Sequence, residues 1–301
     1  MKIAKRFFGG DNIGLLFVFP ALIFMACFVL WPIISNIILS MQNVTVMNLT
    51  KPDKAFVGFD NYLRLFHDPV LGLSVWNTLF YTVFCLIFQF VIGFALALFL
   101  YQRFSFAKPF RGFLMLPWMI PVTVTAMMFR LLFSTNIGII NQALMALSLT
   151  DKPVDWLTSP GTAMFALITA NIWIGIPFNM ILISTGLTTI PRELYESASV
   201  DGAGRLKSFT RITLPLLKPT INSVLILGFI YTFKVFDLVY VMTRGGPVNK
   251  TQMLSTYSYK LSFNLFRYSD GAAVANILFI ILLFVSLIYV KASYLPKEGE
   301  S

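Results

Sequence analysis

Six long stretches of this chain contain no Asp, Glu, Lys or Arg, and they limit what it can fold into. These stretches are Asn12–Thr50, Pro69–Gln102, Gly112–Phe129, Leu131–Thr150, Trp156–Pro191 and Gly271–Val290. A helix that crosses a bilayer needs about 20 mostly apolar residues. Only 12% of the residues are charged, against about 25% in soluble domains. Because a membrane barrel would show short alternating segments instead, the pattern predicts an all-α polytopic membrane protein.

Six transmembrane helices fit these stretches, with boundaries that are accurate to a few residues. The predicted spans are Ile13–Leu39, Asn77–Tyr101, Phe113–Phe133, Thr162–Gly186, Thr220–Met242 and Ala272–Lys291. Residues 1–12 and 292–301 are expected to be terminal segments outside this membrane domain, which covers 13–291. The first apolar region is too long for a signal peptide and lacks a small-residue cleavage site, so it is interpreted as an uncleaved span.

Basic residues indicate how the chain is oriented in the membrane. Six spans place both termini on one side, where the two termini and the two connecting segments together contain thirteen Lys and Arg residues. The opposite loops are longer and contain only eight. Since loops rich in Lys and Arg stay on the cytoplasmic side, we expect both termini and the segment 188–219 to be cytoplasmic.

The sequence shows no motif that is typical of an enzyme active site. It has no GxxxxGK[ST] phosphate-binding loop, no paired carboxylates and no Ser/His/Asp arrangement. Cys27 and Cys85 lie in apolar runs without neighbours at metal-ligand spacing, and His67, the lone histidine, lies in a polar loop. The net charge of +10 is explained by basic residues at span ends rather than by nucleic-acid binding. We therefore expect a protein that is not an enzyme and holds no metal; if ATP powers it, the ATPase is another chain.

The segment 188–219 is dense in charge for so apolar a chain. From Pro191, the residues RELYESASVDGA suit a short helix, because proline and glutamate are favourable in a first turn. Gly202 and Gly204 should end this helix, and RLKSFTRI should form a second one that ends at Leu214–Pro215. The expected result is a helix–turn–helix with Tyr195, Phe209 and Ile212 free to fill a groove on another protein. An amphipathic linker at the lipid surface is the alternative interpretation.

The spacing within this segment resembles that of a known family. Glu196-Ser-Ala-x-x-x-Gly202, followed after nine residues by Ile212-x-Leu214-Pro215, resembles the "EAA" coupling loop of ABC importer permeases. Serine at position 197, where the family has its first alanine, is the single departure. The resemblance implies a cytoplasmic coupling loop that docks on an ATPase subunit. The docking residues would be Glu196, Ser197, Ala198, Asp201, Gly202, Ile212, Leu214 and Pro215.

Further motifs narrow the resemblance to sugar-importer permeases of the maltose/oligosaccharide type. These are Trp173-Ile-Gly-Ile-Pro177-Phe178, Ile190-Pro-x-Glu-Leu-Tyr-Glu196, Phe236-Asp237…Met242-Thr-x-Gly-Gly-Pro247 and Asn77-Thr78. The resemblance implies a carbohydrate substrate and a location in the bacterial inner membrane. Its implied partners are a second similar permease, two ATPase subunits that bind ATP and Mg, and an extracytoplasmic solute-binding protein. This chain would hold no cofactor itself.

A sugar site requires aromatic faces and hydrogen-bonding groups in an apolar cavity. At helical spacing Asn171, Gly175, Phe178 and Asn179 share one face, and amides within a membrane usually face the protein interior. The resemblance implies a substrate path lined by Asn171, Ile174, Gly175, Phe178, Gly228, Tyr231, Thr232 and Val235. Gly228 and Val235 depart from the polar residues of the maltose-type pattern, and ordinary helix packing explains many of these residues equally well.

Two charges occur within the predicted fifth span. Lys234 and Asp237 are three residues apart and are expected to form an i,i+3 ion pair, structural rather than a gate. In the outer loops, Trp156, Asn61, Tyr62 and the turn Gly245–Thr251 are candidates for contact with a binding protein.

Two other functions remain open. An ABC permease for another solute, such as an amino acid or a phosphodiester, would share the coupling loop. A passive channel or ion-coupled transporter would not need that loop, and it would be expected to carry more charges inside the membrane than this chain does.

Overall fold

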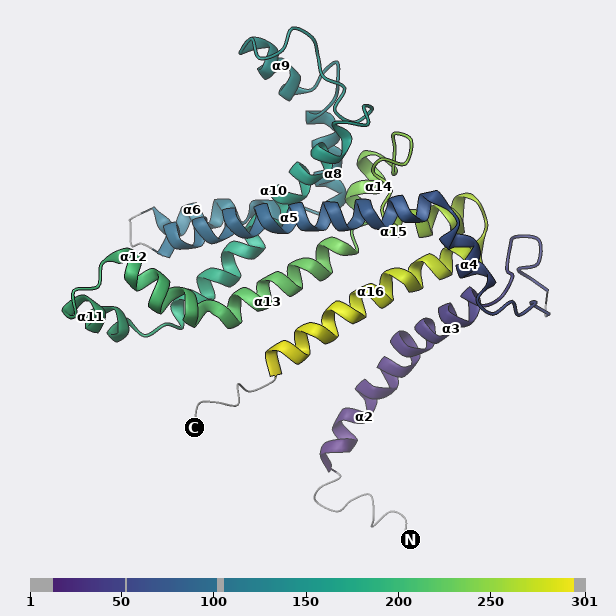
Figure 1. Cartoon of the computed structure of the whole chain (residues 1–301), viewed down its shortest axis with the longest axis horizontal. Helices are drawn as coiled ribbons and strands as arrows, with labels where there is room; N and C mark the ends of the chain where they lie inside the picture. The colour runs from purple at the N-terminus through teal and green to yellow at the C-terminus, as the bar shows by residue number, and fades with distance from the viewer. Residues whose placement is uncertain (1–12, 52, 102–105, 295–301) are drawn as a thin grey trace. The chain divides into compact units, whose positions relative to one another are not determined.

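The computed structural model describes residues 13–51, 53–101 and 106–294, and these residues are almost entirely helical (Figure 1). The described part of the chain contains no strand beyond one isolated bridge between Gln42 and Phe56. It divides into two compact units, residues 1–67 with 258–277 and residues 68–257 with 278–301. The predicted N-terminal segment and most of the predicted tail lie outside the described residues.

The larger unit contains the helices that matter most for function. They are α5 (Pro69–Tyr101), α6 (Ala107–Leu114), α7 (Leu116–Met119), α8 (Val122–Leu132), α9 (Ile139–Ala146), α10 (Ala163–Thr188), α11 (Arg192–Val200), α12 (Arg205–Ser208), the π-helical turn η3 (Phe209–Thr213), α13 (Leu214–Phe233) and α14 (Asp237–Met242). The chain then passes through α15 (Leu254–Tyr259), η4 (Lys260–Asn264) and α16 (Tyr268–Tyr294), which continue from one unit into the other.

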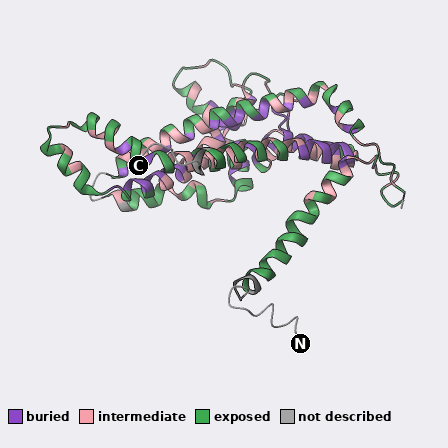
Figure 2. Cartoon of the chain, turned by 60° about the horizontal axis from the view of Figure 1, so that its bottom comes forward, coloured by how far each residue is buried: buried purple, intermediate pink, exposed green. Residues whose placement is uncertain are grey.

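The smaller unit contains α2 (Ile13–Met25), η2 (Ala26–Leu30), α3 (Trp31–Ser40) and α4 (Asp60–Phe66). From Phe17 to Ser40 the helical stretch is exposed over most of its length (Figure 2). Its outer end is held by polar contacts: Asn36 Nδ2 donates to Asn276 Oδ1 at 2.6 Å, and Asn276 Nδ2 donates to Ser40 Oγ at 3.0 Å. Lipid does not drive apolar helices together. A helix in lipid can therefore leave its apolar side chains exposed, and polar contacts such as these hold it to the rest of its unit.

Five helical stretches among the described residues are long and apolar enough to cross a membrane, and α8 is a shorter apolar helix. The five are Phe17–Ser40, Pro69–Tyr101, Ala163–Thr188, Arg205–Met242 and Tyr268–Lys291. They overlap five of the six predicted spans, although α5 begins eight residues before the predicted Asn77 and the stretch Arg205–Met242 begins fifteen residues before the predicted Thr220.

The third and fifth predicted spans are not continuous helices. Phe113–Phe133 is divided among α6, α7 and α8, with extended backbone at Ile120 and Pro121. Proline lacks an amide hydrogen and disfavours helical backbone in the residue before it, which explains the break before Pro121. Thr220–Met242 is interrupted at residues 234–236, between α13 and α14, where no proline is present.

The expected end of the second coupling-loop helix at Leu214–Pro215 is also wrong. Helical backbone continues from α12 through η3 into α13, with Pro215 in the first turn of α13. Proline clashes with the carbonyl group four residues before it. Here the π-helical turn, which includes Arg211, absorbs that clash by widening.

Close contacts at glycine set the packing of α5 against α10. A Cβ atom at Gly93 would lie 2.6 Å from Asn179 Cβ, and one at Gly175 would lie 2.2 Å from Gln89 Cδ. From the second contact to the first, the residue number rises in both helices, from Gln89 to Gly93 and from Gly175 to Asn179, so α5 and α10 run parallel (Figure 1). The backbones can approach only because these positions lack side chains.

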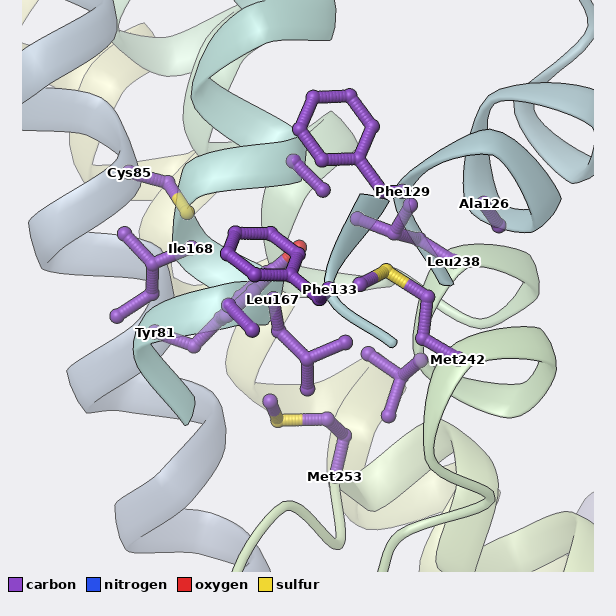
Figure 3. Packing of buried hydrophobic residues seen from close by; sticks show 13 residues of the cluster. Tyr81, Cys85, Ala126, Phe129, Phe133, Leu167, Ile168, Leu238, Met242 and Met253 are labelled. Carbon is purple, nitrogen blue, oxygen red and sulfur yellow. The ribbon is translucent and has the colours of Figure 1, made fainter. Parts of the chain in front are cut away.

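Two apolar clusters lie along this unit. One joins α5 and α10 to α8 and α14, with Tyr81, Phe129, Leu167 and Leu238 among its buried members (Figure 3). The other packs α5, α10 and α13 near the coupling loop and includes Leu217. The two clusters therefore hold the helices of this unit together at two places along their length.

Candidate functional site

A cavity of about 450 Å³ lies within the larger unit. All eight residues of the predicted substrate path line it: Asn171, Ile174, Gly175, Phe178, Gly228, Tyr231, Thr232 and Val235. Asp237, which the sequence also offered as a polar group of the fifth span, lines the cavity as well. Sequence reasoning did not place the other lining residues there: Gln89, Trp118, Ile120, Val122, Lys234, Phe236 and Leu238. The volume falls within the range of about 300–1,000 Å³ that is usual for small-molecule sites.

Three aromatic rings form a connected surface in this cavity. The centroids of Trp118 and Phe178 are 6.3 Å apart, and Phe178 meets Tyr231 edge to face at 5.8 Å. The Lys234 ammonium lies 5.2 Å from the centroid of the Tyr231 ring, within the range of a cation–π contact. Trp118 is 55% exposed and therefore offers a large free aromatic face in the described structure.

Amide groups lie beside these rings. Gln89 Nε2 donates to the Asn171 carbonyl oxygen at 2.9 Å, which ties α5 to the wall of the cavity. The predicted partner Asn179 does not line the cavity, because its side chain is buried against Gly93 and donates to the Gly175 carbonyl oxygen at 2.9 Å. Its role is packing, although it shares the helix face of Asn171.

The predicted ion pair between Lys234 and Asp237 does not form. Lys234 follows the last residue of α13 and Asp237 begins α14, so the two are not neighbours on one helical face. The ion pairs of the described residues join Asp270 to Arg64 and to Arg267. Both Lys234 and Asp237 line the cavity instead.

The two helix breaks build this site. Ile120 and Val122 reach the cavity from the break before α8, and residues 234–237 reach it from the break before α14. Discontinuous membrane helices commonly form binding sites, because irregular backbone is tolerated where it lines a cavity. Pro117 and Pro121, on either side of Trp118, are the sequence signal that could have indicated this wall.

The coupling-loop residues lie on successive elements at one end of α10 and α13. Gly202 has a φ of +74°, which L-residues rarely adopt, and it reverses the chain between α11 and α12. The eight predicted docking residues divide as follows: Glu196, Ser197 and Ala198 on α11, Asp201 and Gly202 in the turn, Ile212 in η3, and Leu214 and Pro215 at the start of α13.

The three side chains expected to fill a partner's groove pack into this chain instead. Tyr195 OH lies 2.8 Å from Thr213 Oγ1, Phe209 meets Phe94 edge to face, and Ile212 packs on the apolar cluster of α5, α10 and α13. They attach the loop to the helices. The most exposed apolar side chains of this segment are Val200, at 88%, and Leu206, at 76%, and Leu194, Leu214 and Leu216 are exposed to a lesser degree.

The loop after α14, which the sequence predicts to be an outer loop, is fixed to α5 by one buried and one part-buried polar contact. Asn77 Nδ2 donates to the carbonyl oxygens of Asn249 and Gln252, both at 3.1 Å, while Val248 at its tip is exposed. In the smaller unit Asn61, a predicted binding-protein contact, is buried and donates to the Ser40 carbonyl oxygen at 2.8 Å. Asn61 therefore cannot offer the surface expected of it.

Comparison with known proteins identifies the family. The model of the "Binding-protein-dependent transport system inner membrane component" family matches residues 89–297. The chain belongs to this family. It is a multi-pass membrane permease of an ABC importer, and the similar proteins are transport subunits.

Two relatives and one solved structure illustrate the similarity of this permease to others. The trehalose/maltose transport system permease protein of Thermococcus litoralis is 33% identical over 95% of this chain and 95% of its own length. The lactose transport system permease protein of Rhizobium radiobacter is 32% identical over 98% and 97%. A chain of a bacterial ABC transporter involved in the import of the acidic polysaccharide alginate superposes with a TM-score of 0.81 at 27% identity, covering 97% of this chain and 98% of that chain.

Proposed function

We propose that this permease carries a sugar or sugar derivative through the cavity bounded by Trp118, Asn171, Phe178 and Tyr231. The convergence of all eight predicted path residues on one cavity is the observation that carries the proposal. Aromatic faces beside amide and hydroxyl groups match a ring that has apolar faces and a polar rim. The relatives named for trehalose, maltose, lactose and alginate transport support a carbohydrate substrate.

We also propose that energy reaches this path from separate subunits. The complete importer would contain this chain, a second similar permease and two ATPase subunits, which bind ATP and Mg. The exposed positions of Glu196 and Asp201, together with Val200 and Leu206, support docking of the ATPase on the coupling loop. The excess of basic residues on this side of the membrane supports a cytoplasmic loop and cytoplasmic termini.

A solute-binding protein would deliver the sugar to the opposite side. The loop of residues 243–253 is the best-supported contact for it, since buried anchors hold the loop while Val248 and Lys250 remain exposed. A similar solved structure is that of a bacterial alginate ABC transporter in complex with an alginate pentasaccharide-bound periplasmic protein. A preorganised loop loses little conformational entropy on binding.

The experiment is to purify the complete importer in proteoliposomes and measure ATP hydrolysis with the binding protein plus single sugars. Maltose, trehalose, lactose, glucose and an alginate oligomer are the sugars, and glutamine and glycerol phosphate represent other solutes. We expect at least one sugar to stimulate hydrolysis and to accumulate inside the vesicles. Stimulation by glutamine or glycerol phosphate alone would replace the sugar by another solute class, and accumulation without ATP would indicate a channel.

A further inference from the structure

The cavity wall at the break between α13 and α14 contains a cation and an anion that do not neutralise each other. Lys234 and Asp237 both line the cavity and are both exposed. Within the described ranges neither side chain takes part in an ion pair. The ammonium group lies over the Tyr231 ring, which leaves its other donor directions open.

Both charges lie in the candidate membrane span Arg205–Met242. A charge within a span needs water or a ligand as a partner, because an unpaired charge is costly away from bulk water. An ammonium group can only donate hydrogen bonds, and a carboxylate can only accept them. A sugar hydroxyl does both, and neighbouring hydroxyls on a ring could satisfy the two groups together. Hydrogen bonds of this charge-assisted kind are stronger than neutral ones.

We propose that Lys234 and Asp237 bind the sugar directly and make the cavity selective for uncharged sugars. This inference rests on the proposed function of the cavity as a sugar path. A sugar with a carboxylate is attracted by Lys234 and repelled by Asp237, so it gains no net advantage from this wall. An uncharged sugar keeps both hydrogen bonds without the repulsion.

The first test measures the charge of the wall without any sugar. Cysteine is placed at Val235, which also lines the cavity, in a chain whose own cysteines are replaced by Cys27→Ser and Cys85→Ala. In the purified complete complex, the modification rate is compared between an anionic and a cationic methanethiosulfonate reagent. We expect Asp237→Asn to shift the rate ratio about fivefold toward the anion and Lys234→Met to shift it about fivefold toward the cation, because each leaves one charge uncompensated.

Matched controls exist on an exposed outer loop, where Asp151→Asn and Lys152→Met make the same charge changes outside the cavity. These two variants should leave the ratio unchanged. An unchanged ratio in Asp237→Asn and Lys234→Met as well would show that the two charges do not face the cavity, and the proposal would be overturned.

The second test asks whether sugars contact the two charges. Protection of the cysteine at position 235 is titrated with maltose, trehalose, lactose and digalacturonate, so no binding protein is needed. In the wild-type cavity we expect an uncharged sugar to protect the cysteine at the lowest concentration. Asp237→Asn should improve protection by digalacturonate about tenfold, measured against protection by that uncharged sugar. Lys234→Met should weaken protection by both kinds of sugar.

The outcomes separate this inference from the function on which it rests. If sugars protect the cysteine equally in wild type and in both variants, the cavity is still a sugar path, but the proposed roles of Lys234 and Asp237 are overturned. If digalacturonate protects the wild-type cavity better than the uncharged sugars do, the proposed selectivity for uncharged sugars is overturned. No protection by any of the four sugars, with the reagent ratio still shifted by the variants, rejects the sugar path and with it this inference.

Discussion

Gly93 of α5 lies directly against Asn179 of α10, where an added Cβ atom would be 2.6 Å from Asn179 Cβ and 3.0 Å from the Met180 backbone nitrogen. Neither obstacle is the end of a flexible side chain, so only a separation of the helices could make room. The cavity is built on the same helix pair, since Gln89 and Gly175 meet one turn away and both line it. The spacing of α5 and α10 therefore determines the shape of the cavity.

The first prediction concerns this helix contact. Gly93→Ala should destabilise the purified permease by about 1–3 kcal/mol, the usual cost of overpacking, and lower the midpoint of thermal unfolding. Gly72→Ala in the same helix is the control, because nothing lies within 4 Å of its Cβ position; alanine there should be neutral or slightly stabilising. Equal midpoints for both variants would contradict the close packing.

The second prediction concerns the turn of the coupling loop. Gly202→Ala should cost about 1–2 kcal/mol locally, because alanine resists positive φ, and should reduce sugar-stimulated ATP hydrolysis. Gly204→Ala is matched to it: its Cβ also meets open space, but its φ is −67°, and stimulation should be retained. Gly202→Pro and Glu196→Lys should abolish stimulation while the protein still folds, as judged by its elution as a single species.

A third prediction follows from the hydrogen bond between Tyr195 and Thr213, which joins α11 to the start of α13. Tyr195→Phe keeps the ring in the apolar cluster but removes a bond worth about 1 kcal/mol, and stimulated ATP hydrolysis should fall severalfold. Thr213→Val should have the same effect, and the double variant should be no worse than either one, because both remove a single interaction. Additive losses would show that the two residues act separately.

The fourth prediction concerns the aromatic and amide wall of the cavity. Trp118→Ala, Tyr231→Ala and Asn171→Leu should each lower sugar uptake by proteoliposomes about tenfold, as expected when about 1.4 kcal/mol of binding is lost. Trp76→Ala removes a tryptophan of α5 that is also exposed but does not line the cavity, and sugar uptake by this variant should be normal. Normal uptake in all of the cavity variants would exclude this cavity as the path.

A fifth prediction concerns the outer loop. Asn77→Leu removes both hydrogen bonds that hold residues 249 and 252 and leaves one buried and one part-buried carbonyl oxygen without this donor. We expect the loop to lose order, so that the binding protein stimulates ATP hydrolysis only at higher concentrations. Basal hydrolysis without the binding protein should be unchanged, and a shift in basal hydrolysis would point to a general folding defect instead.

Several features followed from the sequence because they depend on local chemistry. Charge-free runs must be buried in lipid or protein, so the helices near the first, fourth and sixth predicted spans could be placed to within a few residues. The exceptions are the earlier starts of α5 and of the stretch Arg205–Met242, and the breaks in the third and fifth spans. Gly202 was expected to end a helix, and it does so with a positive φ. The eight path residues, implied by a family resemblance, gather around one cavity, although their contact with a sugar stays a prediction.

Other features depended on contacts between distant segments. The periodicity that unites Asn171 and Asn179 could not show that Gly93 takes up the space beside Asn179. Nor could it show that Tyr195, Phe209 and Ile212 pack inward, because an apolar side chain suits either an internal or an external partner.

The sequence by itself determined a helical membrane protein with one charged segment between two spans, residues 188–219, since lipid leaves no other use for long uncharged runs. Only the tertiary structure decided that the helices break at Pro121 and after Phe233, and that both breaks open on one cavity. A proline permits a kink, but packing selects where the backbone leaves the helix. That selection separates Lys234 from Asp237 and exposes both charges to the cavity.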